Sequence, residues 1–372
     1  MGERYFPQGI ATDIAFCNRE SEREALKASI SAHEHIVLVA PRRYGKTSLL
    51  AQVLLENKFA GVRIDLFFVL SQSEVRQAIA HAVAELMAQI LPKNQTAKQK
   101  IIDKIKAINP KLTISVLGQK LEIMSKQNTD QSISELLLAL DHAAEAANKT
   151  CVMVLDEFQQ ISELRENHTI EAAIRHAVES SSNVSYIFCG SKRHLLHEMF
   201  SDKSRPLYHL CDLMTIDRIS SEHYLKFINK MSKKRWQEAM TRDAASEIIH
   251  LTENHPYYLN ALCRYLWREP NLPDIGMVRK HWQEYVLRQA PWIISDLSAL
   301  TLNRKQVLAA LSQKPTKEPL GREFSTRSSL NPSGIQKSLS GLLKLDLVYI
   351  DSNGYYQVLD PAIAYYIREN SL

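Results

Sequence analysis

The chain has 372 residues, of which 45 per cent are hydrophobic and 23 per cent charged, and its formal net charge is +5. This composition excludes a disordered chain, the length suggests two or three domains, and the mild charge permits nucleic-acid binding without requiring it. No apolar stretch approaches the roughly 20 residues that cross a bilayer, so no transmembrane protein is expected.

Cysteine and histidine usage bears on the compartment and on metal binding. The five cysteines contain no C-x-x-C pair, and the 13 histidines form no H-E-x-x-H or Cys/His cluster. This usage favours reduced cysteines in a cytoplasmic protein and argues against a zinc site. The segment from Met1 to Asp13 carries acidic side chains and lacks an apolar core, so no signal peptide is expected.

The first predicted element is a helix that follows Phe16 to Arg23 and runs to about His33. Leu26 and Ile30 are four residues apart, as one face of a helix requires. From these residues alone, the segment is a first helix with a charged, solvated face.

An apolar run from Ile36 to Val39 is followed by a loop with a phosphate-binding pattern and then by a helix-forming run. The residues predicted to surround the phosphates are Ala40, Pro41, Arg42, Arg43, Tyr44, Gly45, Lys46, Thr47 and Ser48. In such a loop the N–H groups converge on the anion, and the helix N-terminus adds partial positive charge. Gly45 permits the turn, Lys46 reaches the β- and γ-phosphates, and the Thr47 hydroxyl ligates Mg²⁺. Ala40 stands where the usual pattern has glycine, and the alternative is a basic loop without a ligand.

The next stretch alternates between strand and helix patterns. Val62 to Val69 is a second buried strand, and Ser73 to about Ile90 is a strongly periodic helix. Two short alternating runs, Leu112 to Val116 and Lys120 to Met124, predict a hairpin inserted between core elements. The lysines before it are better explained as a solvated face than as a binding site.

A second chemical signal follows a helix predicted from Ile133 to Ala147. Cys151 to Leu155 is an apolar run that suits a strand buried on both faces, and Asp156 and Glu157 emerge at its carboxyl end. In a phosphate-loop enzyme, Asp156 holds Mg²⁺ and Glu157 polarises the attacking water. Alone, such a run most often ends in a solvated turn, but together with the Lys46 loop the signal is strong.

Two more strands complete the predicted sheet. After a helix from Thr169 to Val178, the strand that begins at Val184 ends in Ser191, our candidate sensor of the γ-phosphate. Leu213 to Ile216 is a fifth short strand. The alternation of strands and helices predicts a parallel five-stranded sheet covered on both faces.

From Ser220 the pattern changes to helices alone, which predicts a separate all-α lid. The expected helices are Ser221–Trp236, Arg242–Glu253, Pro256–Trp267 and Met277–Trp292. Breaks at Asn254–Pro256 and Glu269–Pro270 separate them.

The last segment predicts three helices and a hairpin, which together make a winged helix. The helices are Asn303–Leu311, Arg322–Ser328 and Ser333–Lys344, and the strands are Leu347–Ile350 and Tyr355–Val358 around an Asn-Gly turn. Such modules place their third helix in the major groove of DNA, where this one shows Gln336, Lys337, Ser340 and Lys344. Winged helices also dock to proteins, so duplex DNA and a protein partner both stay open.

Taken together, these residues resemble the AAA+-related ATPases of the STAND type, in particular the prokaryotic and archaeal family related to origin-recognition initiators. The stretches that carry the resemblance are Phe16–Glu20, Pro41–Leu49, Leu155–Gln159, Phe188–Ser191, His255–Leu259 and Leu359–Pro361. The resemblance implies an AAA+ (ASCE-type) ATP-binding core with slow hydrolysis. It also implies that Arg19 lies in a segment bordering the adenine, and that the helix opening with Pro256 closes over the nucleotide. The lid lacks the arginine that many AAA+ proteins use as a second sensor. Arg193 or Arg205 could replace it, so ring assembly with an arginine finger stays open.

The predicted domains are an ATPase core at 1–219, with the hairpin insertion at about 110–125, a helical lid at 220–298 and a winged helix at 299–372. Glu157, Lys46 and Ser191 are expected to serve catalysis, with Thr47 and Asp156 on the metal. The leading hypothesis is an ATP- and Mg²⁺-dependent switch that engages a partner or DNA in one nucleotide state. A DNA-binding regulator holding ATP structurally is the alternative, and a small-molecule kinase is a third.

Overall fold

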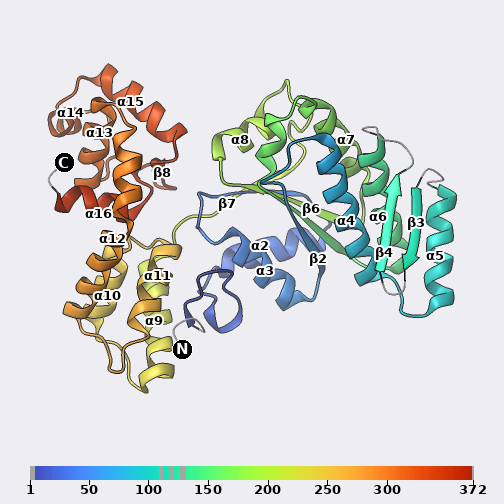
Figure 1. The fold of residues 1–372 in the computed structure, drawn as a ribbon, viewed down its shortest axis with the longest axis horizontal. Helices are drawn as coiled ribbons and strands as arrows, with labels where there is room; N and C mark the ends of the chain where they lie inside the picture. The colour runs from blue at the N-terminus through green and yellow to red at the C-terminus, as the bar shows by residue number, and fades with distance from the viewer. Residues whose placement is uncertain (1–4, 109–111, 118–119, 126–130, 371–372) are drawn as a thin grey trace. The chain divides into compact units, whose positions relative to one another are not determined.

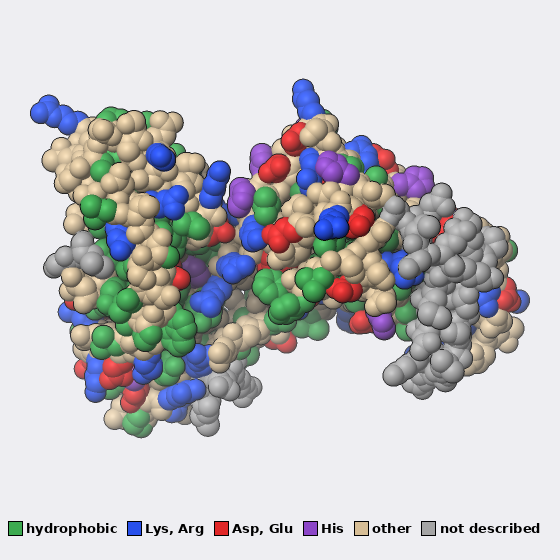
Figure 2. All heavy atoms as spheres, turned by 45° about the horizontal axis from the view of Figure 1, so that its top comes forward, with side chains coloured by type: hydrophobic (Ala, Val, Ile, Leu, Met, Phe, Trp, Pro, Cys, Tyr) green, Lys and Arg blue, Asp and Glu red, His purple; other side chains and the backbone are tan. Residues whose placement is uncertain are grey.

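The computed structural model describes residues 5–108, 112–117, 120–125 and 131–370. They form two compact units (Figure 1). The sheet unit comprises Glu20–Arg42 and Leu49–Ile216, and the helical unit comprises Met1–Arg19, Arg43–Ser48 and Asp217–Leu372. Figure 2 shows basic and acidic side chains interspersed over the face in view, in keeping with the small net charge.

The sheet unit is built on five parallel strands in the order β2-β5-β6-β1-β7. The strands are β1 Ile36–Val39, β2 Ala60–Asp65, β5 Cys151–Asp156, β6 Val184–Gly190 and β7 Asp212–Thr215. The register pairs Asp65 with Asp156 and Val39 with Gly190, so the carboxyl ends of these strands meet at one edge. The parallel five-stranded core predicted from the sequence is confirmed.

Every residue of β1, β5 and β6 is buried, because helices cover both faces of the sheet. Met153 and Leu155 of β5 pack into the larger core of the unit, while Val152 and Val154 alternate onto the opposite face. Ser185 of β6, on that opposite face, donates to the carbonyl oxygen of Ile30 at 3.4 Å. This bond places α2 over that face of the sheet.

The helices of the sheet unit largely follow the predicted pattern. They are α2 Glu20–Ser31, α3 Lys46–Asn57, α4 Gln72–Ile90, α5 Gln95–Ile108, α6 Gln131–Ala147, α7 Asn167–Ser180 and α8 Arg193–Ser201, with a 3-10 helix η2 at Phe158–Glu163. An antiparallel hairpin, β3 Leu112–Leu117 and β4 Lys120–Ser125, lies where the sequence predicts one. Helix α5 was not predicted, since its lysine-rich sequence suggested a polar connection.

The helical unit begins with the 3-10 helix η1 at Asp13–Ala15 and continues with four helices after residue 220. These are α9 Ser221–Trp236, α10 Arg242–Leu251, α11 Pro256–Leu266 and α12 Ile275–Ser298. The prediction ended the last of them at Trp292, but α12 continues through Pro291. A proline inside a helix costs about 3 kcal/mol, and the burial of Ile293 and Leu297 beyond it offsets that cost.

The C-terminal part forms a winged helix of α13 Leu302–Gln313, α14 Arg322–Ser328, α15 Pro332–Lys344, β8 Val348–Ile350 and β9 Tyr356–Val358. The strands join through Gly354, whose φ of 84° is the left-handed conformation that the Asn-Gly pattern predicts. A further helix, α16 Pro361–Glu369, was not predicted. Asp360 caps it by accepting from the N–H groups of Ala362 (2.8 Å) and Ile363 (3.2 Å).

One hydrophobic core runs through the helical unit. It contains Met231 and Trp282 of the first four helices, Leu308 and Leu339 of the winged helix, and Phe6 near the start of the chain. Among the residues that the structure describes, no helix has both the length and the apolarity needed to span a membrane.

Candidate nucleotide site

The loop after β1 has the backbone that its sequence predicts. Lys46 is the first residue of α3, and its side chain is largely buried. Gly45 has a φ of 90°, which L side chains rarely adopt, so glycine is needed here for its backbone conformation. Ala40 is buried at the end of β1 and is absent from the residues with positive φ. An alanine is therefore compatible with the first position of the pattern.

Two contacts anchor the loop within the helical unit. Ser48 accepts a hydrogen bond on Oγ from the N–H of Ala11 at 3.0 Å. The buried Arg19 donates to the carbonyl oxygen of Tyr44 at 3.0 Å and to that of Asp217 at 2.8 Å. Arg19, which the family resemblance puts beside the adenine, thus fixes the loop backbone.

The side chains of Arg43 and Tyr44 contact the start of α11. The guanidinium of Arg43 lies 4.3 Å from the ring centroid of Tyr257, close enough for a cation–π interaction. Tyr44 meets His255 edge-on at 4.8 Å, and its hydroxyl accepts from Nε of Arg218 at 3.1 Å. Pro256, predicted to line the nucleotide site, is the first residue of this helix.

His255 caps α11 as a neutral imidazole. Its Nδ1 accepts from the N–H of Tyr257 at 3.3 Å, so this nitrogen must carry no proton. Burial lowers the pKa of His255 well below its ordinary value, and the positive charges of Arg218 and Arg43 lower it further. The cap therefore remains an acceptor at neutral pH.

Asp156 and Glu157 emerge at the end of β5, as predicted. One carboxylate oxygen of Asp156 accepts from Arg63 of β2 at 2.8 Å, and the other accepts from the N–H of Glu157 at 3.0 Å. Glu157 itself adopts a left-handed backbone, with φ 52° and ψ 37°. Non-glycine residues rarely take this conformation.

A hydrogen-bond network in the sheet unit joins three of the predicted residues. Oε2 of Glu157 accepts from the hydroxyl of Ser191 at 2.7 Å, from the Ser191 N–H at 3.3 Å and from Nε2 of Gln159 at 2.6 Å. Arg42 in turn donates from Nε to the Ser191 hydroxyl at 3.2 Å. Glu157, the predicted base, and Ser191, the predicted phosphate sensor, are therefore hydrogen-bonded to each other.

Comparison with known families identifies the type of domain that carries these residues. Residues 16–262 match an ATPase domain found predominantly in Archaea, and residues 294–369 match a probable winged helix domain. The chain belongs to this ATPase family. The predicted ATPase and winged helix are thereby confirmed. No curated protein has a sequence significantly similar to that of this ATPase.

Solved structures share the fold of the ATPase along nearly its whole length. The Walker-type ATPase PABY2304 of Pyrococcus abyssi has a TM-score of 0.67 and 19% identity, over 96% of this chain and 98% of that one. The ORC2 protein of Aeropyrum pernix, in its ADPNP–ADP complexes, has a TM-score of 0.54 and 12% identity, over 95% and 94% of the two chains. At such low identities the likeness shows a common fold.

The donor set of the ATPase fits a magnesium nucleotide. The loop supplies a lysine, a helix N-terminus and a glycine turn for the phosphates, as anion binding requires. Thr47 and Asp156 offer hydroxyl and carboxylate oxygens, the ligand type that Mg²⁺ prefers. Each unit carries part of the predicted set. The sheet unit holds Ala40, Pro41, Arg42, Asp156, Glu157 and Ser191, and the helical unit holds Arg19, Arg43 through Ser48 and Pro256.

Several residues that shape the site were missed by the sequence analysis. Arg63, Gln159 and Arg218 make close polar contacts with Asp156, Glu157 and Tyr44. Gln159 ends the Leu155–Gln159 stretch but had no predicted role, and Arg63 and Arg218 belong to no recognisable motif. Of the two arginines considered as a second sensor, Arg193 begins α8 and Arg205 forms an ion pair with the buried Glu171. Burial raises the pKa of Glu171 to about 7, although Arg205 opposes that shift.

Proposed function

We propose that the ATPase is a molecular switch that binds ATP with Mg²⁺, hydrolyses it slowly and engages a partner in one nucleotide state only. The observation that carries the proposal is the hydrogen-bonded pair of Glu157 and Ser191 beside Asp156. The Glu157 carboxylate is held in one orientation by a hydroxyl and an amide, as a catalytic base requires. A carboxylate at a solvated strand end needs no such hydrogen bonds. This orientation favours turnover over a nucleotide that is held only structurally.

Each residue has a distinct role in the proposed reaction. Lys46 and the N-terminus of α3 bind the β- and γ-phosphates, and Ser191 contacts the γ-phosphate. Thr47 and Asp156 hold Mg²⁺, which when bound neutralises charge on the phosphate oxygens. Glu157 accepts a proton from the attacking water, and its bonds to Ser191 and Gln159 position the carboxylate for that step.

The adenine specificity of the proposal is supported by a structural neighbour. The ORC2 protein, which shares the fold, was solved in complexes with ADP and with ADPNP. Arg19 and the segment around it are proposed to border the base. The proposed domains are a core at 1–219, a lid at 220–298 and a winged helix at 299–372.

The partner is proposed to bind at the winged helix. Gln336, Lys337, Ser340 and Lys344 of α15 are all exposed, which supports engagement of duplex DNA or of a protein partner through this helix. The competing function is a DNA-binding regulator that holds ATP as a structural ligand. The two functions differ in turnover, so hydrolysis decides between them.

Two variants of the full chain test the proposal. Lys46→Ala is expected to abolish tight ATP binding in a calorimetric titration while the protein stays folded, because it removes a charged phosphate contact. Glu157→Gln is expected to bind ATP normally and to release phosphate at least about 100-fold more slowly, the scale of losing a general base.

Phosphate release should be measured with and without duplex DNA. Stimulation by duplex would identify DNA as the partner, and an unchanged rate would favour a protein partner. Wild-type ATP affinity in Lys46→Ala would contradict the site, and normal turnover in Glu157→Gln would remove Glu157 as the base.

A further inference from the structure

Tyr44 fills a position of the phosphate-binding loop that the phosphate chemistry leaves open to any residue, yet its side chain is fully buried. Its ring meets His255 of the α11 cap at 4.8 Å and Tyr349 of β8 at 6.1 Å, both edge-on. A loop that only bound phosphate would need neither contact. Tyr44 therefore connects the loop with two elements of the helical unit that lie far along the chain.

Two arginines hold Tyr44 at opposite ends. Arg19 donates to its carbonyl oxygen at 3.0 Å, and Arg218 donates from Nε to its hydroxyl at 3.1 Å. The same nitrogen of Arg19 also donates to the carbonyl oxygen of Asp217, the residue before Arg218. Both the backbone and the side chain of Tyr44 are thus fixed to the segment that leads into α9.

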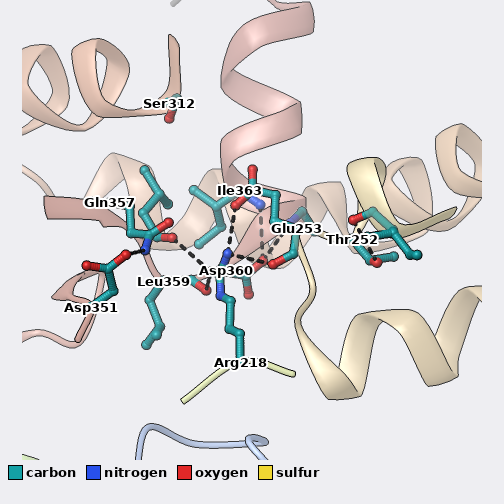
Figure 3. A network of polar contacts seen from close by, with 12 residues as sticks. Arg218, Thr252, Glu253, Ser312, Asp351, Gln357, Leu359, Asp360 and Ile363 are labelled. Carbon is teal, nitrogen blue, oxygen red and sulfur yellow. Dashed lines mark hydrogen bonds and ion pairs between the residues drawn. The ribbon is translucent and has the colours of Figure 1, made fainter. Parts of the chain in front are cut away.

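Arg218 uses every hydrogen-bond donor it has, as Figure 3 shows in part. Besides the Tyr44 hydroxyl, it donates to the carbonyl oxygen of Glu253 at 2.9 Å and to its carboxylate at 3.1 Å. The other two bonds go to the carbonyl oxygens of Val358 (3.3 Å) and Leu359 (3.0 Å). A guanidinium has five N–H groups, so the loss of any one acceptor leaves a donor of this largely buried side chain without its protein partner.

Arg218 stays protonated, and therefore positively charged, in this environment. Burial alone would lower its pKa, but the neighbouring hydroxyls of Tyr44 and Tyr349 and the carboxylate of Glu253 outweigh burial and raise the pKa above its usual value. Removing a partner from a largely buried cation is costly, because the charge stays while its compensation is lost. The contacts of Arg218 are therefore expected to form or break together.

We propose that Arg218 is a positioning residue for the nucleotide, holding the phosphate-binding loop in its binding shape through Tyr44 and transmitting changes in that loop to the backbone before α16. The inference rests on the proposed function, since it takes the adjoining Gly45 and Lys46 to bind phosphate. Gly45, at a φ of 90°, directly follows Tyr44, so a change in the loop backbone moves the Tyr44 hydroxyl. Arg218 has no spare donor. A movement of the Tyr44 hydroxyl therefore changes the hydrogen bonds that Arg218 donates to the carbonyl oxygens of Val358 and Leu359.

Tyr44→Phe tests the connection, because it keeps the ring and removes only the hydroxyl. ATP affinity should fall about tenfold, in line with the loss of a hydrogen bond to a charged group. In wild type, ATP with Mg²⁺ should change the hydrogen exchange of amides in residues 348–363, and Tyr44→Phe should abolish that change. Arg218→Lys keeps the charge without the five-donor fork and should behave like Tyr44→Phe, with the double variant no worse than either.

Ser232→Ala is the matched control. It removes a fully buried hydroxyl of α9 in the same unit, which donates to the carbonyl oxygen of Glu238 at 2.6 Å, and it changes no residue of the loop or of the segment 348–363. This variant should keep wild-type ATP affinity and the exchange response.

Wild-type affinity and response in Tyr44→Phe would overturn the inference. Equal losses in Ser232→Ala would also overturn it, because they would show general loosening of the unit. If wild type itself bound no ATP, the proposed function would fail instead, before this comparison could be made.

Discussion

A single glycine shapes the surroundings of the proposed catalytic base. Gly190 ends β6, and a Cβ added there would lie 1.8 Å from Oε1 of Gln159. Gln159 is fully buried, and its amide nitrogen donates to Glu157. The residue before Ser191 must therefore lack a side chain if Gln159 is to support the carboxylate.

Gly190→Ala is expected to displace Gln159 and so to disturb Glu157. A steric conflict of this kind in a packed interior typically costs about 1–3 kcal/mol of unfolding free energy. Both the urea midpoint and the rate of phosphate release should fall. Gly9→Ala is the control, since a Cβ at Gly9 has no heavy atom within 4 Å. Equal stability of the two variants would show that Gln159 moves aside without cost.

Residues whose chemistry is encoded by local spacing were accessible from the sequence. Gly45, Lys46, Asp156 and Glu157 occupy their expected local places, because a strand followed by a loop or a carboxylate pair has a short-range signature. The contact partner Arg218 was not accessible. Its acceptors lie up to 174 positions away in the chain, and no local pattern encodes such a distance.

At the scale of elements, the beginning of α11 depends on an unusual cap. Histidine is not among the preferred N-cap residues, and His255 serves only while its Nδ1 is unprotonated. Pro256 follows at the first helical position, where its missing N–H has no consequence. The start of this helix is therefore sensitive to pH.

The sign of that sensitivity follows from the lowered pKa of His255. Below about pH 6.5 the unfolded chain binds a proton that the folded chain rejects, so stability is full above this pH and declines as the pH falls. The decline contributed by one group is at most about 1.4 kcal/mol per pH unit. His255→Asn keeps a capping acceptor and removes the titration, so its stability should decline less between pH 7 and pH 5.5.

Urea unfolding followed by tryptophan fluorescence at several pH values would measure the difference. Glu171, with its pKa raised to about 7, acts in the opposite direction and adds stability as the pH falls below that value. Its contribution is the same in both proteins and cancels in the comparison. Parallel pH profiles for wild type and His255→Asn would contradict the role of the histidine.

Elements with strong periodicity were predicted well, and the misses have physical causes. The bounds of α9 and α14 agree with the prediction, since each has clear apolar spacing. The lysines of α5 concealed two buried positions, Ile102 and Ile105, that are three residues apart. The prediction ended α12 at Trp292, but the burial of Ile293 and Leu297 extends the helix to Ser298.

At the scale of the whole molecule, each of the two units has a large hydrophobic core of its own. The four tryptophans, Trp236, Trp267, Trp282 and Trp292, all belong to the helical unit. Tryptophan fluorescence therefore reports on that unit alone, whereas far-ultraviolet circular dichroism reports on both.

We expect the two probes to give different urea transitions, because units with separate cores need not unfold together. ATP with Mg²⁺ should shift the fluorescence transition to higher urea, since the loop residues from Arg43 to Ser48 belong to the helical unit. Coincident transitions with and without nucleotide would show that the two units unfold as one.

The continuous core of the helical unit also limits how this protein can be divided. Leu308 and Leu339 of the winged helix share one apolar cluster with Met231 and Trp282 of the preceding helices. A winged helix cut out by itself would expose its half of that cluster to water, and so would the remainder. If the winged helix is exchanged between related proteins, in the laboratory or in evolution, helices α9 to α12 must therefore be exchanged together with it.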